Sequence, residues 1–299
     1  MTKKSFQGTG TAMITPFKSD GAVDEKALRR FVDFQIEGGV DMLLPCGTTG
    51  EGATLDENET DRVLQIVIEQ VKGRIPVIAG AGSNSTAKAV QMTKRAKKIG
   101  ADGVLSVGPY YNKPTQQGYY EHFKAIAESE DIPIVVYNVP GRTGSNIEAK
   151  TTLRLAEIPN IVAVKEASGN IGQMMDIIRE APRDFRILSG DDAITLPLIA
   201  VGGHGVVSVV SNEAPGMMSA IVNAALQGNM AKAKELHYKL LPLMNINFIE
   251  SNPIPVKAAL AMMGLIEENY RLPLVRISAA SREKLAKALE EVGLLQPAR

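Results

Sequence analysis

The feature that most restricts the fold of this chain is an alternation, repeated eight times, of short apolar segments with longer segments of helical periodicity. Strands that alternate with helices form parallel sheets with right-handed crossovers, so eight such units predict a closed (β/α)8 barrel, the TIM barrel. The predicted strands lie near residues 8–15, 41–46, 76–81, 103–108, 133–139, 161–166, 185–189 and 205–211. An open doubly wound sheet is the alternative, but the first strand lacks the glycine-rich phosphate turn that usually follows it there.

The strand pattern stops after residue 213, and only helical periodicity follows. The helical segments are 214–227, 230–247, 253–265 and 278–292. The first of them is the eighth barrel helix, so three extra helices follow the barrel at the C-terminus. We therefore expect a barrel with the catalytic site over residues 1–228, and a C-terminal helical region, 229–299, packed on that barrel.

Charge and cysteine content argue against several classes of protein. The chain has 299 residues, with 33 Lys and Arg against 33 Asp and Glu, which gives no electrostatic reason to bind nucleic acid or an anionic membrane. The single cysteine, Cys46, rules out an intrachain disulfide and a cysteine-based zinc cluster. The chain also lacks a signal-peptide core and a long apolar run. We expect a soluble, cytoplasmic protein with no nucleic-acid or membrane partner.

Polar and aromatic residues gather in the loops that follow the predicted strands. These loops are GTTGEGATL at 47–55, GPYYNKP at 108–114, YNVPGRTG at 137–144, KEASGN at 165–170 and SGDD at 189–192. In a (β/α)8 barrel the active site lies at the carboxyl ends of the strands. The sequence therefore predicts that the residues able to do chemistry meet at one rim of the barrel.

Lys165 interrupts the apolar strand 161–166. Strand alternation places Ile161, Ala163 and Lys165 on one face, and if that face is the barrel interior the amine stands in a dry environment. An ordinary lysine is neutral in roughly one molecule in a thousand at about pH 7.4, but burial lowers its pKa because it penalises the charged ammonium. A neutral buried amine is the nucleophile that forms a Schiff base with a carbonyl substrate. A lysine that extends out of the strand end, or pairs with a carboxylate, is the alternative interpretation.

Neighbouring groups favour the catalytic interpretation. Tyr137 ends the adjacent predicted strand, and its phenol could move protons during imine formation. The glycine-flanked turn with Thr48 and Thr49 could hold a carboxylate on its N–H groups, and a threonine hydroxyl could relay a proton. The guanidinium of Arg142 suits a second carboxylate. Taken singly, each also fits an ordinary structural role: a core tyrosine, a common turn and a solvated arginine.

Together these motifs resemble the dihydrodipicolinate synthase family, within the class I pyruvate-aldolase superfamily that also contains the sialic-acid lyases. The resemblance extends from residue 8 to about residue 295. It rests on GTTGE at 47–51, PYYNKP at 109–114, YNVPGRTG at 137–144, KEASGN at 165–170, LSGDD at 188–192, GGHGVVSVVSN at 202–212 and NPIPVK at 252–257. The arginine of RTG is the narrower signal, because sialic-acid lyases have no arginine at that place.

The resemblance implies a lyase that condenses pyruvate with L-aspartate 4-semialdehyde to 4-hydroxy-tetrahydrodipicolinate, in the biosynthesis of diaminopimelate and lysine. Lys165 would bind pyruvate as a covalent imine, so no separate cofactor and no metal are expected. Tyr137, Thr48 and Tyr111 would form the proton relay.

The resemblance also assigns substrate contacts. The turn of Thr48 and Thr49 would hold the carboxylate of pyruvate, and the backbone of Val207 would contribute a further contact. Arg142 would hold the carboxylate of the semialdehyde. Gly190 would keep room for the substrate beside the site.

A homo-oligomer, a dimer or a tetramer, is implied as well, because in the family the tyrosine at the position of Tyr111 crosses into the neighbouring subunit's site. Feedback-inhibited relatives bind lysine in a cleft between subunits. The matching positions here include Gly52, Ala53, Glu57, Asn84, Lys88 and Tyr110. Inhibited relatives usually have glutamate in place of Lys88 and histidine in place of Glu57. Lys88 would repel the ammonium of lysine and Glu57 could partly compensate, so we expect weak or absent inhibition.

Three other functions stay open at this point. A related aldolase could use the same lysine on a 2-keto-3-deoxy sugar acid or a sialic acid, and Arg142 argues against it. A metal-dependent aldolase would need ligands, and the chain's histidines lie far apart, at His122, His204 and His237. Asp191 and Asp192 could bind Mg²⁺, but we expect them to cap a helix that begins near Ala193. A barrel that binds a small acid without catalysis is the third alternative.

Overall fold

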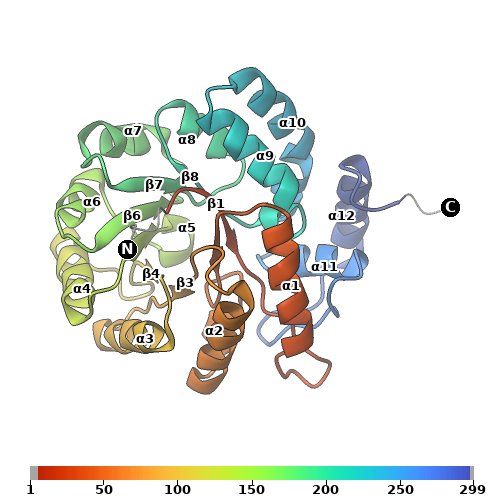
Figure 1. Cartoon of the computed structure of the whole chain (residues 1–299), viewed down its shortest axis with the longest axis horizontal. Helices are drawn as coiled ribbons and strands as arrows, with labels where there is room; N and C mark the ends of the chain where they lie inside the picture. The colour runs from red at the N-terminus through yellow and green to blue at the C-terminus, as the bar shows by residue number, and fades with distance from the viewer. Residues whose placement is uncertain (1–5, 297–299) are drawn as a thin grey trace.

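Eight parallel strands follow one another around a barrel in the computed structural model, which describes residues 6–296 (Figure 1). The strands are β1 Gly8–Ala12, β2 Met42–Leu44, β3 Ile78–Gly80, β4 Gly103–Val107, β5 Ile134–Asn138, β6 Ile161–Glu166, β7 Arg186–Ser189 and β8 Gly205–Ser208. Sequential strands pair, β8 pairs with β1, and a parallel bridge between Leu43 and Val77 connects β2 to the segment before β3. The predicted (β/α)8 barrel is confirmed.

Helices surround the strands, and capping side chains stabilise the starts of several of them. Asp24 accepts a hydrogen bond from the N–H of Ala27, and Asp56 forms a capping box with Glu59. The helices up to the last strand are α1 Glu25–Glu37, α2 Glu57–Val71, α3 Thr86–Ile99, α4 Gln116–Ser129, α5 Pro140–Thr143, α6 Ala149–Ala156, α7 Ile171–Glu180 and α8 Thr195–Ala200, with the 3-10 turn η1 Gly52–Thr54. Within residues 6–296, no helix combines the length and apolarity that a bilayer span requires.

The C-terminal helices lie together on one side of the barrel, against α9 (Figure 1). After β8 come the 3-10 turn η2 Val210–Asn212 and the helices α9 Pro215–Leu226, α10 Met230–Ile246, α11 Ile254–Met262 and α12 Ala279–Glu291. These helices and α8 bury their apolar side chains in one shared cluster. We therefore propose that the region after residue 228 folds together with the barrel rather than as a separable unit.

The barrel interior is filled by alternate side chains of the strands. They include Ala12, Met42, Leu44, Ile78, Leu105, Val135, Tyr137, Ala163, Leu188 and Val207. One detail of the prediction was wrong, because Ile161 packs in the outer core, between the strands and the helices. Ile134 pairs with Ile161 but Val135 pairs with Ala163, so a register shift between β5 and β6 reverses the alternation. On β6, Val162 and Ala163 both pack toward the interior, and the inward face continues to Lys165.

Candidate active site

Lys165 and Tyr137 occupy paired positions on neighbouring strands, β6 and β5, at the carboxyl end of the barrel. The ammonium nitrogen Nζ of Lys165 lies 4.1 Å from the centre of the Tyr137 ring. Both side chains are buried, with 5% and 7% of their surface exposed. A lysine that extends into solvent is thereby excluded, and the amine stands inside the barrel beside a phenol.

The surroundings of this pair favour a neutral amine next to a proton donor. Burial lowers the pKa of the Lys165 ammonium to about 7, because desolvation penalises the charged form. The carboxylate of Asp192 raises this pKa and the positive charge of Arg142 lowers it, both less strongly than burial. Burial also raises the pKa of the Tyr137 phenol to about 12, so the phenol keeps its proton at neutral pH. The pair therefore supplies a nucleophile and an O–H donor together.

Asp192 is a buried carboxylate that sequence reasoning misplaced. The expectation that Asp191 and Asp192 cap a helix near Ala193 was wrong, since α8 begins at Thr195 without a side-chain cap. Oδ2 of Asp192 instead accepts hydrogen bonds from the backbone N–H groups of residues 209 and 210, at 3.1 and 2.8 Å. Burial raises the pKa of this carboxyl to about 6. Asp192 thus ties the loop after β7 to the end of β8 and sets the charge near the amine.

Gly190 makes room for the lysine itself. A Cβ atom at this position would lie 2.6 Å from Cβ of Ala167 and 3.1 Å from Cε of Lys165. Any side chain at Gly190 would therefore collide with the loop after β6 and displace the side chain of Lys165. The space that the sequence prediction reserved for substrate is bordered by Lys165. Val207 is buried on the inward face of β8.

The turn after β2 carries Thr48 and Thr49 at the same end of the barrel. It is closed by backbone hydrogen bonds of 3.1 Å from the N–H of Glu51 to Thr48 and from the N–H of Gly52 to Gly47. Thr48 is exposed, whereas Thr49 is buried and its hydroxyl accepts a hydrogen bond from a side chain of the C-terminal region. The two threonines therefore differ in access to solvent.

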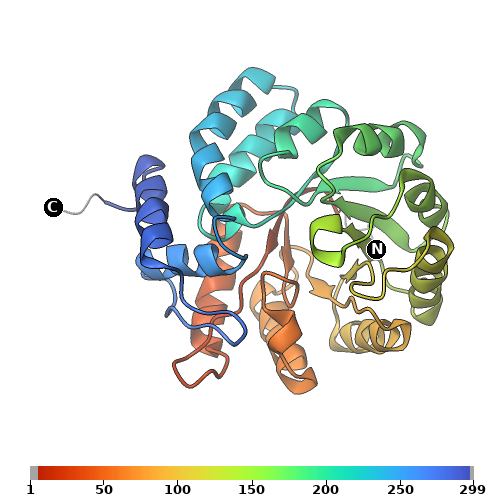
Figure 2. The same cartoon turned by 180° about the vertical axis from the view of Figure 1, so that it is seen from behind.

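Arg142 and Tyr111 lie in the exposed part of the rim. Arg142 belongs to α5, the short helix in front of the barrel in Figure 2, and its charge acts on both Lys165 and Tyr137. Tyr111 is 89% exposed, with a φ of +72° in the left-handed region that non-glycine residues rarely adopt. The single chain does not bring Tyr111 together with the other site residues.

The sequence analysis did not predict a buried hydrogen-bond network at the carboxyl ends of β5 and β6. The carboxylate of Glu166 accepts from Nδ2 of Asn138 at 3.0 and 3.1 Å, from the N–H of Ser168 at 2.7 Å and from Nε2 of Gln173 at 3.1 Å. Oδ1 of Asn138 accepts from the N–H of Ile147 at 3.0 Å. The network fixes both ends of the segment that carries α5. The available signal was an acid directly after Lys165 in a buried strand.

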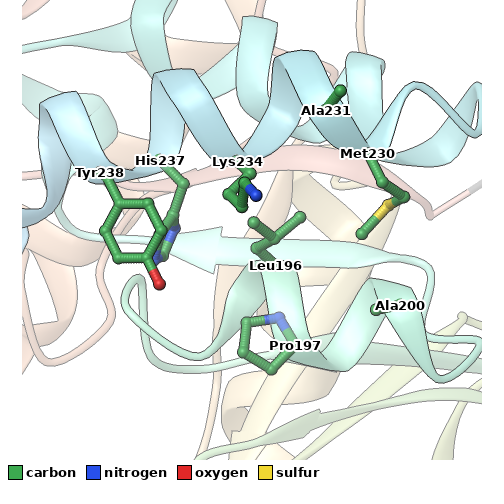
Figure 3. A pocket seen from close by; sticks show the side chains of 8 residues that line it. All are labelled: Leu196, Pro197, Ala200, Met230, Ala231, Lys234, His237 and Tyr238. Atoms are coloured by element: carbon green, nitrogen blue, oxygen red, sulfur yellow. The ribbon is translucent and has the colours of Figure 1, made fainter.

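The histidines and an outer cavity lie apart from this site. His204 accepts a hydrogen bond on Nδ1 from the N–H of Ile187 at 3.2 Å. Among residues 6–296 no three His, Cys, Asp or Glu side chains group as metal ligands. A cavity of about 350 Å³ lies between α8 and α10 (Figure 3), lined by Leu196, Pro197, Ala200, Met230, Ala231, Lys234, His237 and Tyr238. It contains none of the rim residues, so we place the site by its chemistry, at Lys165.

Known proteins of one enzyme family are similar to this chain. Residues 5–292 match the sequence model of the Dihydrodipicolinate synthetase family. A protein of Koribacter versatilis named 4-hydroxy-tetrahydrodipicolinate synthase is 57% identical, over 98% of each chain. One of the same name from Syntrophus aciditrophicus is 56% identical, over 97% of this chain and 99% of that one. The dihydrodipicolinate synthase of Cyanidioschyzon merolae, solved with lysine bound, superposes with a TM-score of 0.95 at 45% identity, over 98% of this chain and all of the other.

Proposed function

The chain belongs to the dihydrodipicolinate synthetase family, and from this premise we propose which of its residues carry out the family's reaction. That reaction is the condensation of pyruvate with L-aspartate 4-semialdehyde to 4-hydroxy-tetrahydrodipicolinate, and the enzyme is a lyase that forms a carbon–carbon bond. The observation that carries the residue assignment is the buried amine of Lys165 beside Tyr137, with a pKa lowered by burial to about 7. The relatives named above give no support to a sugar-acid aldolase.

In the first half-reaction Lys165 binds pyruvate covalently. Its neutral amine adds to the keto carbon, and the resulting carbinolamine loses water to leave an imine. The departing hydroxyl needs a proton, which we assign to the phenol of Tyr137 because burial holds its pKa near 12 and keeps it protonated. The turn of Thr48 and Thr49 holds the carboxylate of pyruvate during this step, with Val207 beside it. Loss of a proton from the methyl group then gives the enamine, the carbon nucleophile.

In the second half-reaction the enamine carbon bonds to the aldehyde carbon of the semialdehyde, and the aldehyde oxygen takes up a proton. The amino group of this substrate then attacks the imine carbon and displaces Lys165, which closes the six-membered ring and frees the amine. Arg142 binds the carboxylate of the semialdehyde, because its guanidinium is exposed at the rim and can donate two parallel hydrogen bonds. Thr48, which is exposed, continues the relay from Tyr137 to solvent, together with the exposed Tyr111 of an adjoining subunit.

This assignment needs no separate cofactor, because the imine on Lys165 itself accepts the electron pair while the new nucleophile forms. It does need a neighbouring subunit. Tyr111 is almost fully exposed on a strained backbone and has no role in the isolated chain. We infer a homo-oligomer in which Tyr111 completes the site of the adjoining subunit. Membership of a family of biosynthetic enzymes for small acids also favours a cytoplasmic location.

Response to lysine is expected to differ from that of the Cyanidioschyzon merolae protein, which binds it. Lys88 is exposed on α3 at the position where inhibited relatives usually have glutamate. Glu57, which could attract the ammonium of lysine, already pairs with Arg95. The ammonium of a bound lysine would therefore be repelled by Lys88 without compensation from Glu57. We propose that feedback inhibition by lysine is weak or absent.

The test of the assignment is to trap the imine. The protein is incubated with pyruvate, reduced with borohydride and analysed by intact and peptide mass spectrometry. One stable adduct per chain on Lys165 is expected, and Lys165→Met removes it. Arg142→Ala should still form the adduct while losing turnover with the semialdehyde. A folded wild-type protein that forms no adduct, or forms it at another lysine, would overturn the assignment.

A further inference from the structure

A side chain from the far end of the sequence reaches the turn that is proposed to bind pyruvate. Asn252 lies in the loop before α11, and its Nδ2 donates a hydrogen bond of 2.9 Å to Oγ1 of Thr49. Both residues are buried, with 6% and 3% of their surface exposed. Asn252 belongs to the NPIPVK segment, to which the mechanism above gives no role.

The direction of this hydrogen bond determines what the threonine can do. A hydroxyl has one proton to donate and lone pairs with which to accept, whereas an amide nitrogen only donates. Because Oγ1 of Thr49 accepts from Asn252, its own proton is left to donate elsewhere. Within residues 6–296 no carbonyl or carboxylate accepts that proton. The buried hydroxyl is therefore a donor directed to a ligand, and a carboxylate is the acceptor that gains most from it.

The other contacts of the turn hold its frame. Oγ1 of Thr15 donates to the carbonyl of Gly50 at 2.7 Å. Nζ of Lys257, in α11, pairs with Oε1 of Glu51 at 2.5 Å, and the backbone N–H of Arg271 donates to Oε2 of the same carboxylate at 3.2 Å. These contacts end on the backbone or on Glu51. The contact from the loop before α11 is distinct, because it ends on a hydroxyl that has a proton to give.

We propose that Asn252 is a positioning residue for pyruvate, whose side-chain amide sets the Thr49 hydroxyl to donate to the pyruvate carboxylate. The inference rests on the proposed function, since it takes the turn after β2 as the pyruvate carboxylate site. It adds a C-terminal residue to substrate recognition and gives the region after the barrel a role at the active site.

Asn252→Asp is the sharpest test, because it keeps the shape and reverses the hydrogen bond. An ionised carboxylate only accepts hydrogen bonds. The Thr49 hydroxyl should therefore donate its proton to the new carboxylate at position 252 and no longer to pyruvate. The pyruvate concentration that half-saturates imine formation should rise about 10- to 100-fold, the usual effect of a lost hydrogen bond to a charged group. Compared with the wild type at the same pH, the defect should shrink as the pH falls through the pKa of the new carboxyl, because the protonated acid can donate again. The KM of the semialdehyde at saturating pyruvate should change little.

A double-mutant cycle separates this role from a general loss of structure. Asn252→Ala should weaken pyruvate binding at every pH, with no recovery in acid. In a Thr49→Val background, which has no hydroxyl, Asn252→Ala should add no further loss. Asn247→Ala is the matched control, because Asn247 is also a buried amide that donates to a side chain, Glu213, and has an unpartnered Oδ1. This variant should lower the free energy of unfolding, but it should not raise the KM of pyruvate more than the KM of the semialdehyde.

The outcomes distinguish this inference from the function on which it rests. A wild-type protein without a pyruvate adduct on Lys165 would remove the function and the inference together. A normal adduct in the wild type, with unchanged pyruvate saturation in Asn252→Asp, would overturn the inference alone. Additive losses from Asn252→Ala and Thr49→Val, or an Asn252→Asp defect that does not respond to pH, would also overturn it.

Discussion

At Lys165, one strong influence and two weaker ones decide the state of the amine. Burial inside the barrel has the largest effect and lowers the pKa of the ammonium to about 7. Asp192 raises that pKa and Arg142 lowers it. Because Arg142 is also the proposed ligand of the second substrate, its charge has two consequences: it favours the neutral amine and it attracts a carboxylate.

The rate of imine formation with pyruvate should therefore increase with pH through about 7 and then level off, since the neutral amine is the form that attacks. Arg142→Ala removes a charge that lowers the pKa of Lys165, so the midpoint should move to higher pH. Asp192→Asn removes a charge that raises this pKa, so the midpoint should move to lower pH. The measurement is the initial rate of borohydride-trapped adduct across a pH series.

Arg154→Ala serves as a control for this pair, because Arg154 is an arginine of α6 whose guanidinium lies 4.1 Å from the ring centre of Tyr120. The pH at the midpoint of imine formation should be the same in Arg154→Ala as in the wild type. A common direction of shift for Arg142→Ala and Asp192→Asn, or no shift in either, would show that charge does not tune the amine.

Among the secondary structure elements, the sequence predicts the centres of the strands and helices well but not where every strand ends. Apolar β-branched runs locate all eight strands because burial on both faces of a parallel sheet selects them. The first strand was expected to reach residue 15, yet β1 ends at Ala12. Beyond it the N–H of Ile14 donates to the side chain of Asn212, at 3.0 Å. A partner 198 residues away has no signature in the local sequence.

The same limit applies to the candidate site. Lys165 and Tyr137 could be placed because each interrupts an apolar strand at its carboxyl end, where barrel chemistry occurs. The contacts that support the turn after β2 could not be predicted, because Asn252 and Lys257 reach it from more than 200 residues away. Local periodicity describes which face a residue occupies, but long-range hydrogen bonds depend on how the last helices pack on the barrel.

The ion pair between α11 and the turn after β2 should be needed for stability. Nζ of Lys257 and the carboxylate of Glu51 are both buried, and the same ammonium lies 4.4 Å from the ring centre of Phe17. Lys257→Met leaves a buried carboxylate without its counter-charge, so we expect a loss of about 3–5 kcal/mol in the free energy of unfolding. Adding Glu51→Gln to Lys257→Met should recover much of it. Urea unfolding followed by circular dichroism measures both changes.

Lys287→Met is the matched control, since Lys287 pairs with Glu283 at 3.0 Å on the exposed face of α12. Exposed pairs contribute about 0–1 kcal/mol, so this variant should unfold almost as the wild type does. Equal losses of unfolding free energy in Lys257→Met and Lys287→Met would contradict the prediction, because the buried pair would then contribute no more to stability than the exposed one.

In the whole molecule, the rim that is proposed to bind substrate continues into surfaces that a single chain leaves open. The loop of Tyr110 and Tyr111, between β4 and α4, has both tyrosines exposed, and Lys88 is exposed on the neighbouring helix α3. The assembly proposed here would cover these surfaces with a second copy. Two predictions depend on that assembly.

Lysine should inhibit this enzyme weakly or not at all at sub-millimolar concentrations, because Lys88 repels its ammonium and Glu57 is already paired with Arg95. Lys88→Glu should increase the sensitivity. Initial rates with both substrates across a lysine series give the measurement. Lys94→Glu, an equal change of charge at another exposed position of α3, should leave the response unchanged. Strong inhibition of the wild type at sub-millimolar lysine would contradict the prediction.

The sharing of Tyr111 between subunits can be tested by mixing two inactive variants. Tyr111→Phe and Lys165→Met should each have little activity as pure oligomers. A hybrid dimer has one site that lacks both residues and one site that combines an intact Lys165 with an intact Tyr111. Random exchange puts half of the dimers in the hybrid form with one working site each, so mixing should restore up to about a quarter of the wild-type activity.

If Tyr111 instead serves the site of its own chain, each site of the hybrid lacks one of the two residues and mixing restores nothing. Arg142→Ala provides the control, because Arg142 acts on Lys165 within the same chain. Mixing Arg142→Ala with Lys165→Met should therefore give no recovery, since every site then lacks one or the other group. Recovery with Tyr111→Phe but not with Arg142→Ala would assign the exposed tyrosine to the neighbouring subunit and explain why a buried amine depends on a residue that its own chain leaves in solvent.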